Sequence, residues 1–177
     1  MKTILAFTGS NSAHSINAKL LKAVVKKIPG QEVITLDLKD YEVPIYSMEQ
    51  ENRAFPAAIE QLFHLFRKAD GFIIASPEHN GLPTAFLKNT IDWLSRVDQK
   101  FFGEKPVLLL STSPGQNGGR SGLEILAQLL PRWGGRVTSL FSLGAFQQNF
   151  DEARYAIENP DLDRELEEAA TTLAGQL

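Results

Sequence analysis

The sequence predicts a doubly wound α/β fold built on a five-stranded parallel sheet. Two features of the 177-residue chain predict it. Short, continuous apolar runs alternate along the chain with segments whose apolar residues recur every three or four positions. The apolar runs lack a polar alternation, which is typical of parallel strands that are covered on both faces. Right-handed crossovers then place helices on both faces of the sheet.

The first half of the chain supplies two of the strands. Residues 3–7 are an apolar run that ends at a glycine, and residues 33–36 form the second run. Between them, residues 15–28 are predicted to be a helix, because apolar residues repeat every four positions until a Pro-Gly pair stops it. Residues 39–55 form a long connection without a clear period.

The middle of the chain contains the next two helices. Residues 56–68 have a proline at their start and one apolar face. The third strand, residues 72–75, leads into a helix at 83–97 whose apolar residues cover more than one face. We expect this helix to bury one side in the core and the other against a second subunit; burial within one protomer is the alternative.

The last third completes the pattern. A strand at 107–110 is followed by a turn at 111–119, and the strand at 137–143 is followed by a polar segment and a helix at 161–176. The helix between these strands is marked by Leu123, Leu126, Leu130 and Trp133. No repeat or low-complexity tract divides the chain, so we expect residues 1–177 to form one domain.

Composition excludes several classes of function. The net charge of −3 shows no basic surplus, so neither nucleic acid nor an anionic membrane is an expected partner. There is no cysteine, which excludes disulfides, thiolate catalysis and cysteine-bound metals. No apolar run reaches the ~18 residues of a membrane-spanning helix, and no secretory signal is recognisable. The cytoplasm is therefore the expected location.

Three turns follow strands that end at one edge of the predicted sheet, where ligands of such folds bind. The first, residues 8–17, is rich in hydroxyls and opens directly into a helix, which is typical of an anion site. It matches neither the nucleoside-triphosphate loop nor the dinucleotide fingerprint. Simple helix capping is the alternative explanation, although capping needs only one such side chain.

The second and third turns, residues 76–81 and 111–119, each have an ordinary explanation as well. The second reads as a strand-to-helix loop that turns at Asn80-Gly81, and the third as a flexible surface loop. Gly118 and Gly119 could equally let the backbone approach a flat ligand. Together the three turns suit a ligand with a phosphate at one end and a polar planar ring at the other.

Other catalytic arrangements are disfavoured. The three histidines lack the spacing of metal ligands, and no paired carboxylates flank a plausible cleft. Ser10 lacks the G-x-S-x-G elbow of a serine hydrolase. We expect a structural role for the Glu78 side chain. No catalytic residue and no metal site are therefore predicted.

The three turns resemble those of the NAD(P)H-dependent FMN reductase family, which has a flavodoxin-like fold. The first family motif, G-S-x-R-x-x-S-x-N, matches at Gly9, Ser10, Ser15 and Asn17. The second, S-P-E-Y-N with P-x-x-L-K-N-x-I-D-W-L-S, matches at Ser76, Pro77, Glu78, Asn80, Pro83, Leu87, Lys88, Asn89, Ile91, Asp92, Trp93, Leu94 and Ser95. The third, S-x-S-P-G-x-x-G-G, matches at Ser111, Ser113, Pro114, Gly115, Gly118 and Gly119.

The resemblance implies strand order 2-1-3-4-5 and noncovalently bound FMN. NADPH or NADH would be the co-substrate, and a flavin, a quinone or an azo compound the small-molecule acceptor. It also implies a homodimer or a dimer of dimers. Hydride would pass directly from nicotinamide to the flavin, so no catalytic acid or base is obligatory. The implied cofactor-binding residues are Gly9, Ser10, Ser12, Ser15, Ile16, Asn17, Pro77, Glu78, His79, Asn80, Gly81, Ser111, Ser113, Gly118 and Gly119.

Two alternatives stay open, a flavodoxin-like electron carrier and a non-enzymatic flavin-binding protein. Such carriers are usually much more acidic than −3. The sequence also departs from the family at two positions. Ser12 replaces the arginine of the first motif, which removes a cation from the phosphate site, and His79 replaces the tyrosine of the second.

Overall fold

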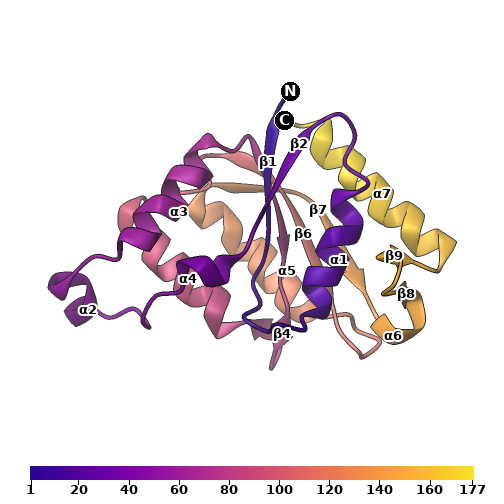
Figure 1. The fold of residues 1–177 in the computed structure, drawn as a ribbon, viewed down its shortest axis with the longest axis horizontal. Helices are drawn as coiled ribbons and strands as arrows, with labels where there is room; N and C mark the ends of the chain where they lie inside the picture. Colours follow the sequence, from indigo (N-terminus) through magenta and orange to yellow (C-terminus); the bar gives the residue numbers. More distant parts are fainter.

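A computed structural model describes all of residues 1–177 and contains a five-stranded parallel sheet in the order β2-β1-β3-β6-β7 (Figure 1). Counted by sheet strands, this is the predicted order 2-1-3-4-5, and the predicted fold class is confirmed. The strands are β1 (Thr3–Thr8), β2 (Glu32–Leu36), β3 (Gly71–Ala75), β6 (Lys105–Thr112) and β7 (Gly135–Leu143).

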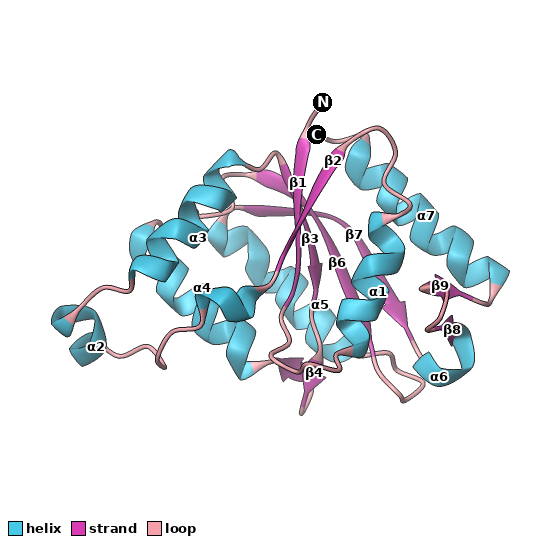
Figure 2. Ribbon diagram, viewed as in Figure 1, coloured by secondary structure: helices cyan, strands magenta, loops and turns pink.

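Helices cover both faces of the sheet (Figure 2). One face packs against α3 (Ala57–Lys68), α4 (Ala85–Val97) and α5 (Arg120–Leu129), and the other against α1 (Ile16–Val25) and α7 (Pro160–Ala174). Strand residues alternate between the two cores, so Phe7 joins the first and Ala6 the second. None of the helices combines the length and apolarity that crossing a membrane would need.

Some element boundaries differ from the predicted ones. The helix expected to reach residue 28 ends at Val25. The segment marked by Leu123 to Trp133 divides into α5 and a 3-10 turn, η2 (Leu130–Trp133). Pro131 stands at the start of η2 and Gly134 ends it with a φ of 78°. A proline tightens the chain here because it cannot donate to an α-helical hydrogen bond.

Several short elements were not predicted. The connection 39–55 contains most of η1 (Leu38–Tyr41) and the helix α2 (Met48–Arg53). Two small hairpins also occur, β4 (Glu78–His79) with β5 (Leu82–Pro83) and β8 (Phe150–Asp151) with β9 (Ala156–Ile157). The one-turn helix α6 (Phe146–Asn149) precedes the second hairpin. Elements of this length are too short to establish a hydrophobic period.

The second apolar face of α4 is buried within the same protomer. Trp93 is completely buried, and its indole Nε1 donates a 2.8 Å hydrogen bond to the carbonyl of Pro44. The rings of Tyr46 and Phe55 meet the indole edge-on at centroid distances of 5.2 and 5.5 Å. The connection 43–55 therefore covers the face that the sequence offered to a second subunit, and α4 alone is no argument for an oligomer.

Candidate active site

The three polar turns meet at the carboxyl edge of the sheet around a pocket of about 250 Å³. Many residues predicted from the sequence line it: Ser10, Ser12, Ser15, Ile16, Asn17, Pro77, Glu78, His79 and Ser113. His14, Thr112 and Pro114 line it too, although the sequence analysis did not single them out as binding residues. The other predicted residues lie outside the lining and belong to the supporting backbone: Gly9, Asn80, Gly81, Ser111, Gly118 and Gly119.

The hydroxyls of the first loop fold it into successive tight turns. Ser10 Oγ accepts a 3.2 Å hydrogen bond from the backbone N–H of Ser12, and Ser12 Oγ accepts one of the same length from His14. Ser15 caps α1, because its Oγ accepts from Ala18 N at 3.2 Å. The capping explanation thus holds for Ser15. The first backbone N–H groups of α1 have no partner within the helix and lie at the pocket. Free N–H groups at the start of a helix are suited to binding an anion.

A missed residue, Thr84, fixes the first loop to α4. Its Oγ1 donates a 2.5 Å hydrogen bond to the carbonyl of Gly9 and accepts one of 3.0 Å from Leu87 N, capping α4. A Cβ on Gly9 would lie 2.8 Å from Leu87 Cδ2, so only glycine fits this close approach. The recognisable signal was a threonine immediately before an apolar helical pattern.

Asn17 connects the first loop to the third. Its Nδ2 donates to the carbonyl of Thr112 at 2.9 Å, and its Oδ1 accepts from Thr112 N at 3.0 Å. The side chain is only 3 % exposed. Because both ends of the amide are occupied by the backbone of β6, Asn17 can reach a ligand chiefly through its own backbone N–H.

The second loop is the β4–β5 hairpin. Asn80 and Gly81 form its turn with φ values of 54° and 76°, and two successive positive values are typical of a type I′ turn. The turn predicted at Asn80-Gly81 is therefore confirmed. His79 is exposed at the pocket rim, and Pro77 lies between the hairpin and β3.

Glu78 connects this hairpin to α5. Its Oε2 accepts a 2.8 Å hydrogen bond from the backbone N–H of Gly122, which lies in the first turn of that helix. A carboxylate at a helix N-terminus is favourable for both the free N–H groups and the helix dipole. The structural role expected for the Glu78 side chain is confirmed, although the residue also borders the pocket.

The glycines of the third loop are required by packing within the chain. Gly118 and Gly119 have φ values of 62° and 77°, which disfavour other residues. A Cβ on Gly118 would lie 2.5 Å from Ser142 Oγ, and one on Gly119 would overlap Ser111 Oγ. Ser111 is fully buried beneath Gly119, and its hydroxyl has no hydrogen-bond partner. These residues therefore fix the conformation of the third loop and do not themselves line the pocket.

The pocket offers hydrogen-bond donors but little positive charge. Its lining contains no lysine and no arginine, and Glu78 is the only carboxylate. That carboxylate already accepts from Gly122. A phosphate would consequently be held by hydroxyls and by the N-terminal N–H groups of α1.

Comparison with known proteins identifies the family. The family profile described as NADPH-dependent FMN reductase matches residues 2–148. The chain belongs to this family. The reductase is 33% identical over 128 residues to a quinone reductase of Escherichia coli, covering 72% of this chain and 68% of the relative. It is 32% identical over 116 residues to an NAD(P)H-dependent FMN reductase of Pseudomonas aeruginosa, covering 65% and 62% of the two chains.

A solved structure with the same fold covers almost the whole reductase. The flavoenzyme NAD(P)H:acceptor oxidoreductase FerB of Paracoccus denitrificans superposes with a TM-score of 0.83 over 99% of this chain and 97% of that one, at 23% identity. Membership of the family makes the protein an FMN-dependent NAD(P)H oxidoreductase.

The residues of the pocket fit FMN. The donors at the N-terminus of α1 match a phosphate, and the positive end of the helix dipole offsets part of its charge. The β4–β5 hairpin and residues 113–114 line the same pocket, and a planar ring would pack against them. The three predicted turns are thus brought into one site.

Proposed function

We propose that residues 1–177 form one FMN-binding domain that takes hydride from NADPH or NADH and delivers it to a small-molecule acceptor. Bound FMN supplies the redox chemistry. The pocket that joins all three loops is the observation that carries this proposal. A quinone, an azo compound or free flavin would be the acceptor; the quinone reductase of Escherichia coli among the relatives supports the first. We place the reaction in the cytoplasm, where reduced nicotinamide nucleotides are made.

The first loop would bind the FMN phosphate. Its donors are the hydroxyls of Ser10 and Ser12 and the N–H groups of Ile16 and Asn17 at the start of α1. Ser15 Oγ already accepts from Ala18, but its hydroxyl proton is free to donate. Thr84 would act as a positioning residue, because it fixes the carbonyl of Gly9.

The hairpin and the third loop would orient the isoalloxazine ring. Glu78 fixes the hairpin against α5, and the Asn80-Gly81 turn gives it one conformation. His79 is exposed at the rim, so the reactive edge would be open to nicotinamide and then to the acceptor. Sequential use of one open site is the arrangement of a ping-pong reaction.

Steady-state kinetics test this function against its alternatives. FMN-loaded protein should oxidise NADPH when a soluble quinone is supplied, with the parallel double-reciprocal plots of a ping-pong reaction. Protein stripped of FMN is the control. An electron carrier would need a separate reductase to oxidise NADPH. A flavin-binding protein without enzymatic activity would retain FMN and leave NADPH unchanged.

We also propose a homodimer, which could pair further into a dimer of dimers, formed through the surface around the start of α4. Three large apolar side chains are exposed there or in the adjoining connection: Ile45 at 85 %, Met48 at 68 % and Leu82 at 53 %. A hollow of about 170 Å³ joins Ile45 to Phe86 and to Asn11 of the first loop. A partner seated on this surface would lie beside the flavin pocket.

Light scattering tests the assembly. The wild-type protein should be dimeric or tetrameric at micromolar concentration, and the double variant Ile45→Glu/Leu82→Glu should be monomeric. Ile34→Glu is the matched control, because Ile34 is 43 % exposed on the edge strand β2, away from this surface. A monomeric wild type would contradict the proposal.

A further inference from the structure

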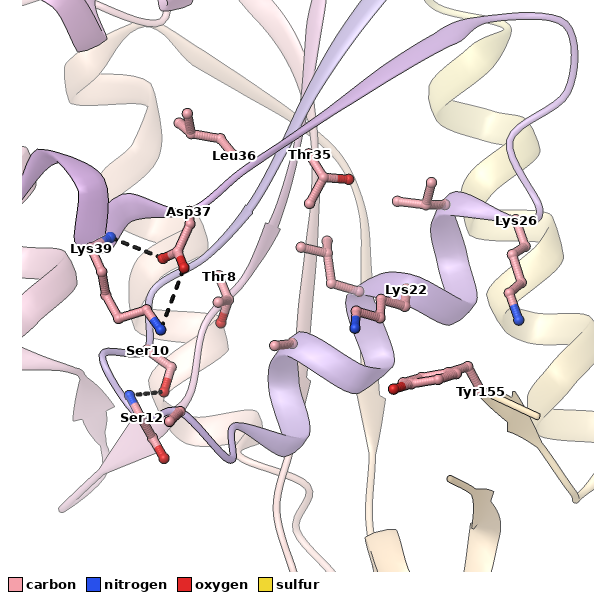
Figure 3. Close-up of a pocket in the computed structure, with 14 residues that line it drawn as sticks. Thr8, Ser10, Ser12, Lys22, Lys26, Thr35, Leu36, Asp37, Lys39 and Tyr155 are labelled. Carbon is pink, nitrogen blue, oxygen red and sulfur yellow. Dashed lines mark hydrogen bonds and ion pairs between the residues drawn. The ribbon is translucent and has the colours of Figure 1, made fainter. Parts of the chain in front are cut away.

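A second hollow, of about 530 Å³, lies between α1 and β2 (Figure 3). It shares only Ser10 and Ser12 with the flavin pocket and extends along α1 in the other direction. Its volume is within the range of small-molecule sites. We call this hollow the α1–β2 groove. It follows α1 from Ser12, before the helix begins, to Lys26, just after it ends, and it is bounded by β2 and Tyr155.

The groove has an apolar wall and polar groups at its back. Ala18, Leu21 and Val25 of α1 form the wall, and β2 borders the hollow at Leu36, whose side chain packs into the core on the other face of the sheet. Figure 3 shows the hydroxyls of Thr8 and Thr35 between the two elements. Mixed lining of this kind, apolar with a few polar groups, is typical of sites for organic ligands.

Positive charge is concentrated in the groove. Lys22, Lys26 and Lys39 line it, and Asp37 is its only carboxylate. Asp37 Oδ2 lies 3.4 Å from Lys39 Nζ, whereas neither Lys22 nor Lys26 has a carboxylate within ion-pair distance. In Figure 3, Lys22 and Lys39 lie on opposite sides and extend toward the space between them. This surplus occurs in a chain whose net charge is −3.

Tyr155, in the hairpin connection between β8 and β9, holds two of these lysines in place. The Nζ atoms of Lys22 and Lys26 lie 4.8 and 5.5 Å from its ring centroid. Lys26 also donates a 2.8 Å hydrogen bond to the carbonyl of Arg154. Tyr155 has a φ of 50°, a conformation that is costly for a bulky residue and that is often associated with functional sites.

An ordinary explanation accounts for only part of this arrangement. Lysines near a helix C-terminus stabilise the helix dipole, and Lys22 stands in the last turn of α1. That explanation does not cover Lys39, which belongs to η1 and borders the same hollow. Nor does it account for the apolar wall between the two charged sides.

We propose that the α1–β2 groove is a second binding site, for an organic phosphate of nucleotide size. The phosphate lies between Lys22 and Lys39, the apolar part of the ligand packs on Leu21 and Val25, and the exposed edge of Asp37 accepts from ligand hydroxyls. The ligand is either the phosphorylated adenosine end of a nicotinamide co-substrate or a separate nucleotide. The proposal depends on the groove alone and not on the proposed reaction.

Calorimetry with adenosine 2′,5′-bisphosphate as the probe tests the site. The protein is saturated with FMN beforehand, so that the flavin pocket is closed to the probe. We expect one binding site for the bisphosphate, and binding of unphosphorylated adenosine that is weaker by about ten-fold or more. The double variant Lys22→Ala/Lys39→Ala should weaken the bisphosphate by a similar factor. Lys68→Ala, which removes an exposed lysine from the last turn of α3, should leave it unchanged.

The outcomes separate the site from the reaction and identify the source of the ligand. Absence of saturable binding, equal affinity for adenosine, or unchanged affinity in the double variant would overturn the proposal, whether or not the protein oxidises NADPH. Where the calorimetry supports the site, inhibition that is competitive with NADPH assigns the groove to the co-substrate. Non-competitive inhibition assigns it to a separate nucleotide.

Discussion

Asn17 and Thr112 exchange two hydrogen bonds, of 2.9 and 3.0 Å, between the start of α1 and the end of β6. They are 95 positions apart in the sequence. This pair holds the first loop against the third, so two of the three loops around the proposed FMN pocket are connected through one buried amide. The side chain of Asn17 is therefore not expected to contact the phosphate. Instead, its amide fixes the position of the backbone N–H groups that would bind the anion.

Replacing Asn17 with alanine should destabilise the protein and weaken FMN binding. The variant loses both hydrogen bonds and leaves the buried backbone of Thr112 without a partner, at a cost of about 2 kcal/mol. Urea unfolding and FMN titration measure the two effects. Asn11→Ala is the matched control, because Asn11 is exposed in the same loop and makes no hydrogen bond to the protein. Equal unfolding free energies for the two variants would contradict the prediction.

Thr84→Val should affect the first loop from the other side. Valine preserves the volume of threonine but loses the bond to the Gly9 carbonyl and the cap on Leu87 N, which together cost about 1–2 kcal/mol. We expect lower stability and weaker FMN binding. Thr84→Ser retains the hydroxyl and should keep most of both. If the valine variant bound FMN as tightly as the serine variant, Thr84 would not position the loop.

Asp70 predicts a pH dependence of stability. Its carboxylate accepts from Thr3 N at 2.9 Å and from Lys2 Nζ at 3.0 Å, and these bonds hold the pKa of Asp70 below its ordinary value of 3.8. A folded-state pKa below the unfolded one contributes stability above the unfolded pKa, and that stability is lost as the pH falls through the folded pKa.

The difference in unfolding free energy between wild type and Asp70→Asn should thus be constant from neutral pH to about pH 5 and shrink in more acidic solution. Chemical denaturation at a series of pH values measures it. Asp40→Asn is the control, because Asp40 is exposed in η1 and its side chain forms no ion pair. A difference that grew on acidification would contradict the assignment.

The sequence was sufficient for the sheet because its strands are buried on both faces. Residues 72–75 and 107–110 are continuous apolar runs, and every one of them is buried in the structure. The short α2 and the β8–β9 hairpin were missed because their few residues cannot show a period. The sequence left open what covers the second face of α4 for a different reason: the cover of Trp93 comes from Pro44, Tyr46 and Phe55, which only the folded chain brings to α4.

The sequence predicted which residues form the site more completely than it predicted the contacts between them. Local patterns identified Ser10, Ser12 and Ser15, whose hydroxyls act on residues close to them in the chain. The bond from Asn17 to Thr112 spans the fold, and no spacing rule reports it. The α1–β2 groove was not predicted at all, because Lys22, Lys39 and Tyr155 come from three separate elements.

Ser12 provides the sharpest test of where the FMN phosphate lies, because it replaces the arginine of the family motif. A phosphate monoester carries close to two negative charges at neutral pH, and the pocket lining contains no lysine or arginine to meet them. A charge-assisted hydrogen bond is worth about 1.5–3 kcal/mol. Exposure of Ser12 reduces this toward about 1 kcal/mol, which corresponds to a roughly five-fold change in affinity.

Ser12→Arg should therefore tighten FMN binding about five-fold at low ionic strength, and by less at high ionic strength, where the charges are screened. The substitution also removes the bond that Ser12 Oγ accepts from His14 N, so Ser12→Ala is the matched control for that loss. FMN titration of both variants at two salt concentrations separates the added charge from the lost hydroxyl. If the arginine variant bound FMN no better than the alanine variant at low salt, the phosphate would not lie at the first loop, because a cation introduced beside a dianion must strengthen its binding.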